Sequence, residues 1–564
     1  CVFCSCFSHL LVAVDDDEFF DGERPFAAPT LRPMITSLKS AALSIYWPHG
    51  SLLLNRSGRP PPALASALLR LLRQLYDRDM RRSFMGGASA WFADASRQQT
   101  IESLAQRMDP IVLDAVQADG VEAAATASQA SSASAAAGGG SMGGGNGGGL
   151  PLSELPEAKR VASLLLRMPF TLSFEQRLRV LRRWLHADRE ERLSAMLFGQ
   201  TPHTITVRRE HLLADAHREL KGFGLRLRSP LRVKFLGIDD LEEAGLGEGV
   251  AKEFLVDVLK AGFDPAFGLF SATPDGTLYP NPAAPLRIPE STQLYEFLGA
   301  VLAKTLYEGI LVELPLAPFF VSRLLGRTNT VADLPYMDRG LYDSLMFVKR
   351  YDGADLENMT LSFAVEQYTD ETLPPERRRQ VALKPNGENV AVTLTNRLEY
   401  VFLVSHYRLN TQMRRPCDAF LRGFGEVVPA AWVNMFSPHE LQLVLGGSDA
   451  PLDVDDWRAH AVYSGGYHPE HPVIKWLWQV LREFDGPHRA ATLKFATSCS
   501  RPPLMGFAHL MPQFCVHRAT DEEGRLPTSA TCMNLLKLPP YESLEVLRER
   551  LTYAIEAGCG FELS

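Results

Sequence analysis

The sequence predicts an α+β protein composed of more than one folded unit, and three features lead to that prediction. Apolar residues recur at helical spacing through most of the 564 residues. Short segments with strand patterning occur at a few places between the helices. A run rich in alanine, glycine and serine over residues 121–154 has almost nothing to bury, so it predicts a disordered linker between two folded parts.

The composition excludes several functional classes. An apolar fraction of 46% and a charged fraction of 22% are ordinary for a globular protein, and a net charge of -8 gives no reason to expect a nucleic-acid partner. We find no apolar run of the ~18 residues needed to span a membrane. The eight cysteines do not form two CxxC pairs, so we predict no disulfide framework, no metal site and no other cofactor. Sparse cysteines indicate a reducing compartment, the cytoplasm or the nucleus.

The first part of the chain, residues 1–120, predicts helices. Its clearest amphipathic stripe is made by Leu64, Leu68, Leu71, Leu72 and Leu75. The chain starts with an apolar stretch that lacks the basic start and cleavage site of a signal peptide, and we interpret the region as a fragment of a larger N-terminal part. Beyond the linker, residues 155–200 predict a further helical extension.

Residues 201–447 predict a larger unit of helices with a few short strands. Residues 204–209 alternate between polar and apolar side chains, and residues 233–236 form a second strand pattern. A long helix is predicted within residues 297–315, with Pro315 at its end.

A hinge is predicted where this unit ends. Gly446 and Gly447 free the backbone, and Pro451 fixes the exit of the segment 448–451. The remaining residues, 452–564, predict a small unit of amphipathic helices and short strands. Its predicted elements are helices over 473–484 and 544–555 and strands near 514–517 and 535–538.

One cysteine stands out because of its surroundings. Cys532 lies between hydroxylic residues that can turn the chain and a short buried strand that begins at Leu535. Such a thiol is anchored on one side and reachable on the other, as a nucleophile requires. A lone cysteine is more often a small core residue, so its position alone leaves both interpretations open.

A resemblance decides between them. The runs RLPTSATCMNLLKLP at 525–539 and GFELS at 560–564 resemble the C-terminal lobe of the HECT-type E3 ubiquitin ligases. FLGAVLAKTLYEGILVELP at 297–315 and LKFATSCSRPP at 493–503 are further matches, so the resemblance spans residues 201–564 in family order. It implies a bilobal catalytic domain, with a mostly helical N-lobe, the hinge and a small α/β C-lobe.

The resemblance also implies where the partner that delivers ubiquitin binds. A subdomain at about 335–410 is similar to the one that docks the ubiquitin-conjugating enzyme, E2. Positions lining its apolar groove are matched by Leu341, Leu345, Val348, Tyr351 and Tyr400.

The chemistry implied by the resemblance is a two-step acyl transfer. Ubiquitin passes from a thioester on the E2 to Cys532 and then to a lysine of a protein substrate. Thr531 and Asn534 match loop positions that could hold the thioester carbonyl, and Phe561 matches a tail residue that many HECT ligases need. The expected partners are the ubiquitin-charged E2, ubiquitin and protein substrates with acceptor lysines.

The MNLLKLP and GFELS motifs are shared with the proteasome-associated subgroup that extends ubiquitin chains. That subgroup implies polyubiquitin chains for proteasomal degradation and the proteasome as a further partner. The sequence departs from many relatives at Ala530, where they have histidine, and at Met533, where they have phenylalanine. No histidine follows Cys532, and the base that deprotonates the acceptor stays open between Ser564 and the acidic run at 521–523.

Two other functions remain as alternatives. A cysteine protease would need a histidine such as His509 or His517 to activate Cys532. A non-enzymatic scaffold would bind E2 or ubiquitin without forming a thioester. The span of the matching segments favours the ligase.

Overall fold

The structure is a computed structural model that describes residues 1–46, 62–110, 112–113, 116, 157–196, 203–236, 248–353, 356–367, 379–519 and 525–557. The linker predicted over 121–154 lies outside these residues. The fold is α+β, as the sequence predicts, because helices dominate and the strands of the described ranges form only small sheets.

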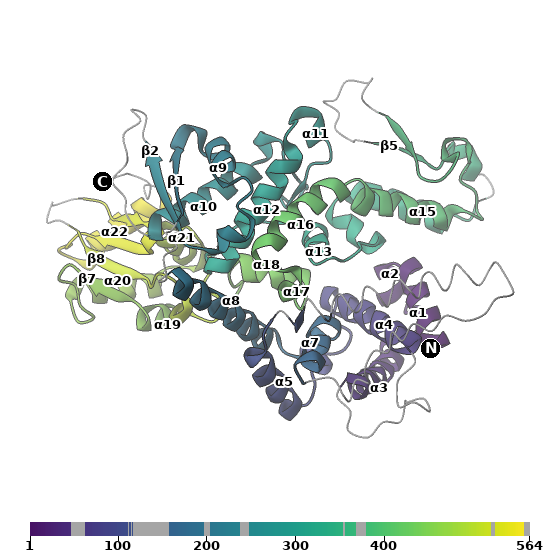
Figure 1. The fold of residues 1–564 in the computed structure, drawn as a ribbon, viewed down its shortest axis with the longest axis horizontal. Coiled ribbons are helices and arrows are strands. Elements are labelled where there is room, and N and C mark those ends of the chain that lie inside the picture. Colours follow the sequence, from purple (N-terminus) through teal and green to yellow (C-terminus); the bar gives the residue numbers. More distant parts are fainter. Residues whose placement is uncertain are drawn as a thin grey trace.

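The molecule is elongated (Figure 1). The C-terminal residues, drawn in yellow, occupy one end, and α15 (Arg397–His406) with β5 (Ala364–Glu366) occupies the opposite end. The N-terminal helices lie below α15 in this view. Buried apolar residues of the described ranges form two clusters, one spanning residues 4–445 and one spanning residues 454–554. We call residues 203–446 the large lobe and residues 452–557 the small lobe.

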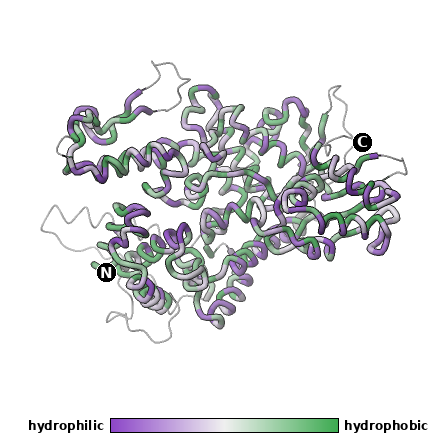
Figure 2. Tube along the Cα trace, turned by 180° about the vertical axis from the view of Figure 1, so that it is seen from behind, coloured by the Kyte–Doolittle hydropathy of each residue, from purple (hydrophilic) through white to green (hydrophobic). Residues whose placement is uncertain are grey.

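The N-terminal part is helical, as predicted. Its helices are α1 (Val2–Ala13), α2 (Asp16–Phe20), α3 (Ala28–Tyr46), α4 (Pro62–Arg81) and α5 (Ala95–Arg107). The leucine stripe of α4 forms the centre of this region, because Leu68, Leu71, Leu72 and Leu75 are all buried. Figure 2 shows hydrophobic and hydrophilic residues alternating along these helices, as expected for helices with one buried face.

The predicted helical extension consists of α7 (Glu157–Arg167) and α8 (Phe174–Met196). Between them, Phe170 packs edge-on against Trp91 of the N-terminal part, with ring centroids 5.4 Å apart. On α8, the buried Arg177 forms an ion pair with Glu440 of the large lobe at 2.6 Å. The extension therefore joins the N-terminal helices to the large lobe.

The large lobe is mostly helical. Its strands are β1 (His203–Arg208), β2 (Leu231–Leu236), β3 (Phe270–Ala272), β4 (Leu278–Pro280), β5 and β6 (Gln380–Ala382). Its helices are α9 (Leu212–Leu220), α10 (Glu248–Phe263), α11 (Ala284–Arg287), α12 (Ser291–Glu308), α13 (Pro318–Leu324), α14 (Arg339–Arg350), α15, α16 (Arg414–Val427), α17 (Ala430–Val433) and α18 (Pro438–Gly446). The predicted strands at 204–209 and 233–236 are confirmed as β1 and β2, which pair in parallel.

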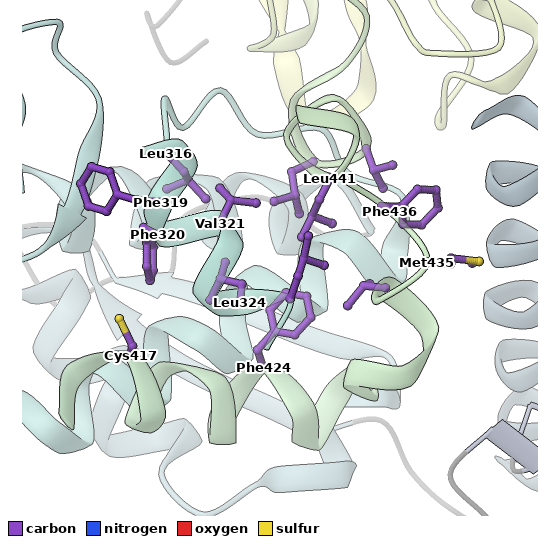
Figure 3. Packing of buried hydrophobic residues seen from close by; sticks show 14 of the residues in the cluster. Leu316, Phe319, Phe320, Val321, Leu324, Cys417, Phe424, Met435, Phe436 and Leu441 are labelled. Carbon is purple, nitrogen blue, oxygen red and sulfur yellow. The ribbon is translucent and has the colours of Figure 1, made fainter. Parts of the chain in front are cut away.

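The core of the large lobe depends on the contact between α12 and α16. A Cβ atom on Gly299 would lie 2.0 Å from the Phe420 carbonyl oxygen, and one on Gly423 would lie 1.7 Å from the Glu296 carbonyl oxygen. These two glycines let the helix backbones touch. Figure 3 shows the apolar cluster above α16, in which Phe424 of α16 lies beside Leu324 of α13, and Leu441 of α18 lies farther from α16.

One sequence prediction is wrong here. The helix predicted to run to Pro315 ends at Glu308, because Gly309 adopts the left-handed conformation with φ 74°. A glycine directly after a helix ends it at no steric cost. The following segment, residues 310–315, has no regular secondary structure, and the Pro315 carbonyl accepts a hydrogen bond from the backbone N–H of Leu278.

The small lobe combines a sheet with covering helices. Its elements are α19 (Val454–Ala459), β7 (Val462–Ser464), α20 (Pro472–Glu483), α21 (Gly486–Thr497), β8 (Cys515–Arg518), β9 (Thr528–Ala530), β10 (Leu535–Leu538) and α22 (Leu544–Glu556). The strand order is β7-β8-β10-β9, with β10 parallel to β8 and antiparallel to β9. The predicted strands at 514–517 and 535–538 are confirmed as β8 and β10.

Within the described ranges, we find no helix whose length and apolar character would let it cross a membrane.

Candidate active site

Cys532 lies at the tip of a tight connection between two strands. The 3-10 helix η12 (Thr531–Met533) links β9 to β10, and Asn534 closes the turn with φ 49°. Asparagine tolerates this left-handed conformation better than most residues. Cys532 is half-buried, while the neighbouring Met533 is exposed. The thiol is therefore held by the sheet and still reachable, as the sequence predicts for a nucleophile.

Asn534 is fully buried, at 0% exposure, and its side chain holds the turn from inside. Its Nδ2 donates a hydrogen bond to the Pro512 carbonyl oxygen at 2.6 Å. Its Oδ1 accepts one from Nζ of Lys252 at 2.5 Å. Both ends of the amide are thus occupied, so in this arrangement Asn534 positions the cysteine loop.

Lys252 belongs to α10 of the large lobe, but all three hydrogen bonds of its ammonium go to residues of the small lobe. Besides Asn534, its Nζ donates to the carbonyl oxygens of Thr531 at 2.9 Å and Thr497 at 3.2 Å. Only 7% of the lysine is exposed. Burial lowers the pKa of Lys252 to about 8, against the smaller opposing effect of thiolate charge at Cys499 and Cys532.

The electrostatic environment of Cys532 contains opposing influences. Burial raises the pKa of its thiol, and the Glu253 carboxylate raises it further. The Lys252 ammonium and the backbone N–H groups of Cys532 and Met533 favour the thiolate but do not fully offset burial. The thiol of the free protein is therefore mostly protonated at neutral pH.

A cavity of about 710 Å³ adjoins Cys532. It lies between α8, the large lobe and the small lobe, with apolar walls that include Leu181, Leu255 and Leu311. His509 also lines it. In the described ranges, Cys532 has no hydrogen bond to a histidine, and no group of three or more side chains could hold a metal ion.

Comparisons with known proteins show the family of the chain. Residues 256–564 match the family model described as HECT-domain (ubiquitin-transferase). The chain belongs to the HECT-domain family.

Relatives from three kingdoms match beyond the HECT domain. The chain is 35% identical over 585 residues to E3 ubiquitin-protein ligase UPL6 of Arabidopsis thaliana, covering 100% of this chain and 51% of the relative. It is 33% identical over 599 residues to Ubiquitin-protein ligase E3B of Homo sapiens, covering 100% of this chain and 50% of the relative. It is 34% identical over 425 residues to E3 ubiquitin-protein ligase HUL5 of Saccharomyces cerevisiae, covering 72% of this chain and 45% of the relative. The chain spans about half the length of these relatives.

The HECT residues predicted to line the E2 groove lie on α14, α15 and the turn after α14, and most face inward. Leu345, Val348 and Tyr400 are buried, and Leu341 and Tyr351 are half-buried. Tyr400 packs edge-on against Phe363, with ring centroids 5.5 Å apart. The outward apolar positions are different residues. Phe347 is 56% exposed, Leu398 53% and Phe402 49%.

The predicted hinge glycines adopt two different conformations. Gly446 is the buried last residue of the helix α18, whereas Gly447, directly after the helix, has φ 94°. The segment that follows is bound to the small lobe in this structure. Ser448 donates its backbone N–H to the Pro502 carbonyl at 2.8 Å, and Arg501 pairs with Asp449 at 2.8 Å.

Phe561, Ser564 and the acidic run 521–523 lie outside the described residues. His517, which a protease would need, bonds Ser464 instead, with its Nδ1 2.9 Å from the hydroxyl oxygen.

Sequence reasoning missed Lys252, although a signal for it exists. Lys252, Leu255, Val256 and Leu259 follow helical spacing, and the three apolar residues are buried. A lysine at a position of an apolar stripe indicates a buried charge with a specific partner.

Proposed function

We propose that this chain is the catalytic part of an E3 ubiquitin ligase that carries ubiquitin as a thioester on Cys532. The observation that carries the proposal is the position of Cys532 in a chain of the HECT-domain family. It lies half-buried on a rigid turn between two strands, beside a cavity between the lobes. A thiol held in this way can attack an acyl carbonyl without first rearranging the backbone.

The reaction is two successive acyl transfers. The Cys532 thiolate attacks the thioester carbonyl at the ubiquitin C-terminus, and the E2 thiolate leaves. A neutral lysine amine of the substrate then attacks the new thioester, the Cys532 thiolate leaves, and the nitrogen loses a proton as the isopeptide bond forms. The first step exchanges one thioester for another and is nearly isoenergetic, so a cysteine suits this relay better than a serine.

The E2 is proposed to bind the apolar surface of α14 and α15. Phe347, Leu398 and Phe402 supply the exposed anchors that such an interface requires, with the predicted residues Leu341 and Tyr351 at its edge. Leu345, Val348 and Tyr400 support this surface from beneath. The small lobe and α15 lie at opposite ends of the molecule (Figure 1), so loading of Cys532 requires a change in lobe orientation. We assign this motion to Gly447 and the segment 448–451.

The subgroup motifs support a finer proposal. HUL5 and E3B are among the relatives, and the sequence carries the MNLLKLP motif of the chain-extending subgroup at 533–539. We therefore propose polyubiquitin chains for proteasomal degradation as the product, with the proteasome as a partner. The proposed location is the cytoplasm or the nucleus, because a nucleophilic thiol stays reduced there.

The test is a non-reducing gel after brief incubation of residues 1–564 with E1, E2, ATP and labelled ubiquitin. We expect an adduct that thiol reductant removes and that Cys532→Ala abolishes. Cys532→Ser should give an adduct that resists reductant, because an ester replaces the thioester. Cys515→Ala is the matched control, since Cys515 is another half-buried cysteine of the same lobe. An adduct that survives Cys532→Ala would place the acyl group elsewhere.

A further inference from the structure

Lys252 is a buried cation without an acidic partner among the described residues. Its hydrogen bonds go to two backbone carbonyls and one amide oxygen, and we find no ion pair to it in the described ranges. A buried ammonium is costly unless its surroundings compensate for lost water. The Lys252 ammonium lies at the contact between the lobes, where it bonds the residues on either side of Cys532.

We propose that Lys252 is a positioning residue for ubiquitin transfer, which binds the Cys532 loop from the large lobe and stabilises the thiolate when the small lobe rests on α10. The inference rests on the proposed function, because it assigns a role in the same reaction. It adds a residue on the lobe opposite to the one that carries the cysteine.

The geometry supports a positioning role. Two of the three acceptors of Lys252, the Thr531 carbonyl and the Asn534 amide oxygen, lie on the two sides of Cys532 in the chain. The third, the Thr497 carbonyl, lies at the end of α21. One ammonium therefore connects the cysteine turn to a helix of the small lobe and to α10 of the large lobe. Movement of the turn would break at least one of these hydrogen bonds.

The hydrogen bonding of Lys252 favours a positional role over proton transfer. An ammonium has three N–H donors, and Lys252 has three acceptors. With a pKa of about 8, it remains mostly protonated at neutral pH. Lys252 therefore acts through position and positive charge.

Other ionisable groups of the described residues also lie near Lys252. Glu253 opposes thiolate formation at Cys532, and it is paired with Arg209 at 2.9 Å. Cys499 faces Lys252 from the small lobe but is buried, and burial raises its pKa to about 12. Arg182 of α8 lines the same small cavity as Lys252, together with Arg501 and His509 of the small lobe.

The contact exists only while the lobes are together. When the small lobe turns away, Lys252 loses all three acceptors, and Cys532 loses the nearby positive charge. Thiolate stabilisation at Cys532 is therefore coupled to lobe orientation. The same charge stabilises Cys532 as the leaving thiolate when the acceptor lysine takes ubiquitin.

The test compares Lys252→Met, which removes the charge and keeps the length, with Lys252→Arg, which keeps the charge. Lys260→Met is the matched control, because Lys260 lies on the same helix, is exposed and pairs with Asp257 at 3.6 Å. The first readout is the rate at which iodoacetamide alkylates Cys532 at each pH, measured by mass spectrometry of its peptide. The exposed Cys6 in the same chain serves as the internal standard.

We expect the alkylation midpoint of Cys532 to move to higher pH in Lys252→Met and to stay near that of wild type in Lys252→Arg. The second readout is discharge of the Cys532–ubiquitin thioester to free lysine in a single turnover. We expect it to be ~10-fold slower in Lys252→Met, the effect of losing a charge-assisted hydrogen bond. Lys252→Arg should recover much of the rate, and Lys260→Met should match wild type.

An unchanged alkylation profile together with an unchanged discharge rate in Lys252→Met would overturn the inference. If Lys252→Met loses its near-UV circular dichroism, its tertiary packing is disturbed, and Lys252→Gln replaces it in the test. Lys252→Gln keeps an N–H donor but lacks the charge, so the alkylation midpoint of Cys532 must move to higher pH in it as well. Failure of the wild type to form any thioester would refute the proposed function instead, and the alkylation profile would still decide whether Lys252 acts on the thiol.

Discussion

Lys349 of α14 forms an ion pair of 2.8 Å with Asp15, which precedes α2 and is 0% exposed. The same ammonium is also paired with Glu18 at 2.6 Å and bonded to the Ala13 carbonyl at 2.9 Å. Asp15 and Glu18 form the capping box that starts α2. The N-terminal helices are thereby attached to α14, one of the two helices proposed to bind the E2.

We expect Lys349→Met to destabilise this attachment by ~3 kcal/mol, because it leaves the buried Asp15 carboxylate without its main partner. Hydrogen exchange of α1, α2 and α14 should speed up, and urea denaturation should show an earlier first transition. The control is Arg82→Met, which breaks the exposed pair of Arg82 and Asp21 and should cost at most ~1 kcal/mol. Equal effects of the two substitutions would contradict this prediction.

The acid stability of the large lobe should depend on Asp215. Hydrogen bonds from Arg208, followed by the charge of Arg218, hold the pKa of this buried carboxyl well below its usual range despite burial. The folded state therefore binds fewer protons than the unfolded state. The stabilisation is fully present above the unfolded pKa of about 4 and is lost as pH falls below it.

Melting temperatures measured from pH 7 to pH 3 would check that the stabilisation by Asp215 is lost as the pH falls. Wild type should lose stability steeply below about pH 4, and Asp215→Asn should be less stable at pH 7 with a flatter acid limb. Parallel acid limbs for the two proteins would show that Asp215 is not responsible.

The two hinge glycines should respond differently to alanine. Gly447→Ala places a side chain at φ 94° and only 3.0 Å from Cβ of Arg501, which should cost ~1–2 kcal/mol. Gly446→Ala lies in a helix and should be tolerated, because its nearest contact is 3.4 Å from the Val312 carbonyl oxygen. We expect only Gly447→Ala to change limited proteolysis between the lobes and the rate of ubiquitin discharge. The idea fails if both variants behave as wild type.

Substitutions of exposed and of buried residues at the proposed E2 surface should have different effects. Phe402→Ala should weaken E2 binding ~10-fold with little change in melting temperature, because the ring is exposed and anchors are few. Val348→Ala should instead lower the melting temperature, since it leaves a cavity under α14. Titration of each variant with E2 in fluorescence anisotropy, alongside thermal unfolding, measures both effects. Retained E2 affinity in Phe402→Ala would move the binding surface elsewhere.

The crossing of α12 and α16 should tolerate no added methyl group at Gly423. Its Cβ would lie 1.7 Å from a backbone oxygen, so Gly423→Ala must push the helices apart at a cost of at least ~3 kcal/mol. Gly425→Ala on the same helix has no atom within 4 Å and should be neutral or stabilising by up to ~1 kcal/mol. The midpoints of urea denaturation of the two variants measure this difference in stability. Similar midpoints would mean that the helix crossing can relax.

Local patterns predicted most of the secondary structure. The leucine stripe of α4, the alternation in β1 and the apolar residues of β10 each depend on spacing along one segment. The prediction that α12 ends at Pro315 is wrong, because proline is not the first residue able to stop this helix. Gly309 acts earlier, since a left-handed residue is enough to end a helix.

The candidate active site was only partly predictable from the sequence. Cys532 was identified from the motif around it, because the turn and the strand that hold it are contiguous in sequence. The E2-groove residues were matched by position, but burial depends on which face of α14 meets the core. That face is set by packing with distant segments.

The sequence by itself determined the family, the cysteine proposed as the nucleophile, the helical and strand segments and the break between the lobes, because each of these is encoded in consecutive residues or in spacing along one element. Only the tertiary structure decided that Lys252 lies behind Cys532 and that Lys349 is joined to Asp15. These pairs are separated by hundreds of residues, so their contact depends on how whole lobes and helices pack. Which charged or polar groups surround a buried residue is therefore decided by that packing and not by the local sequence.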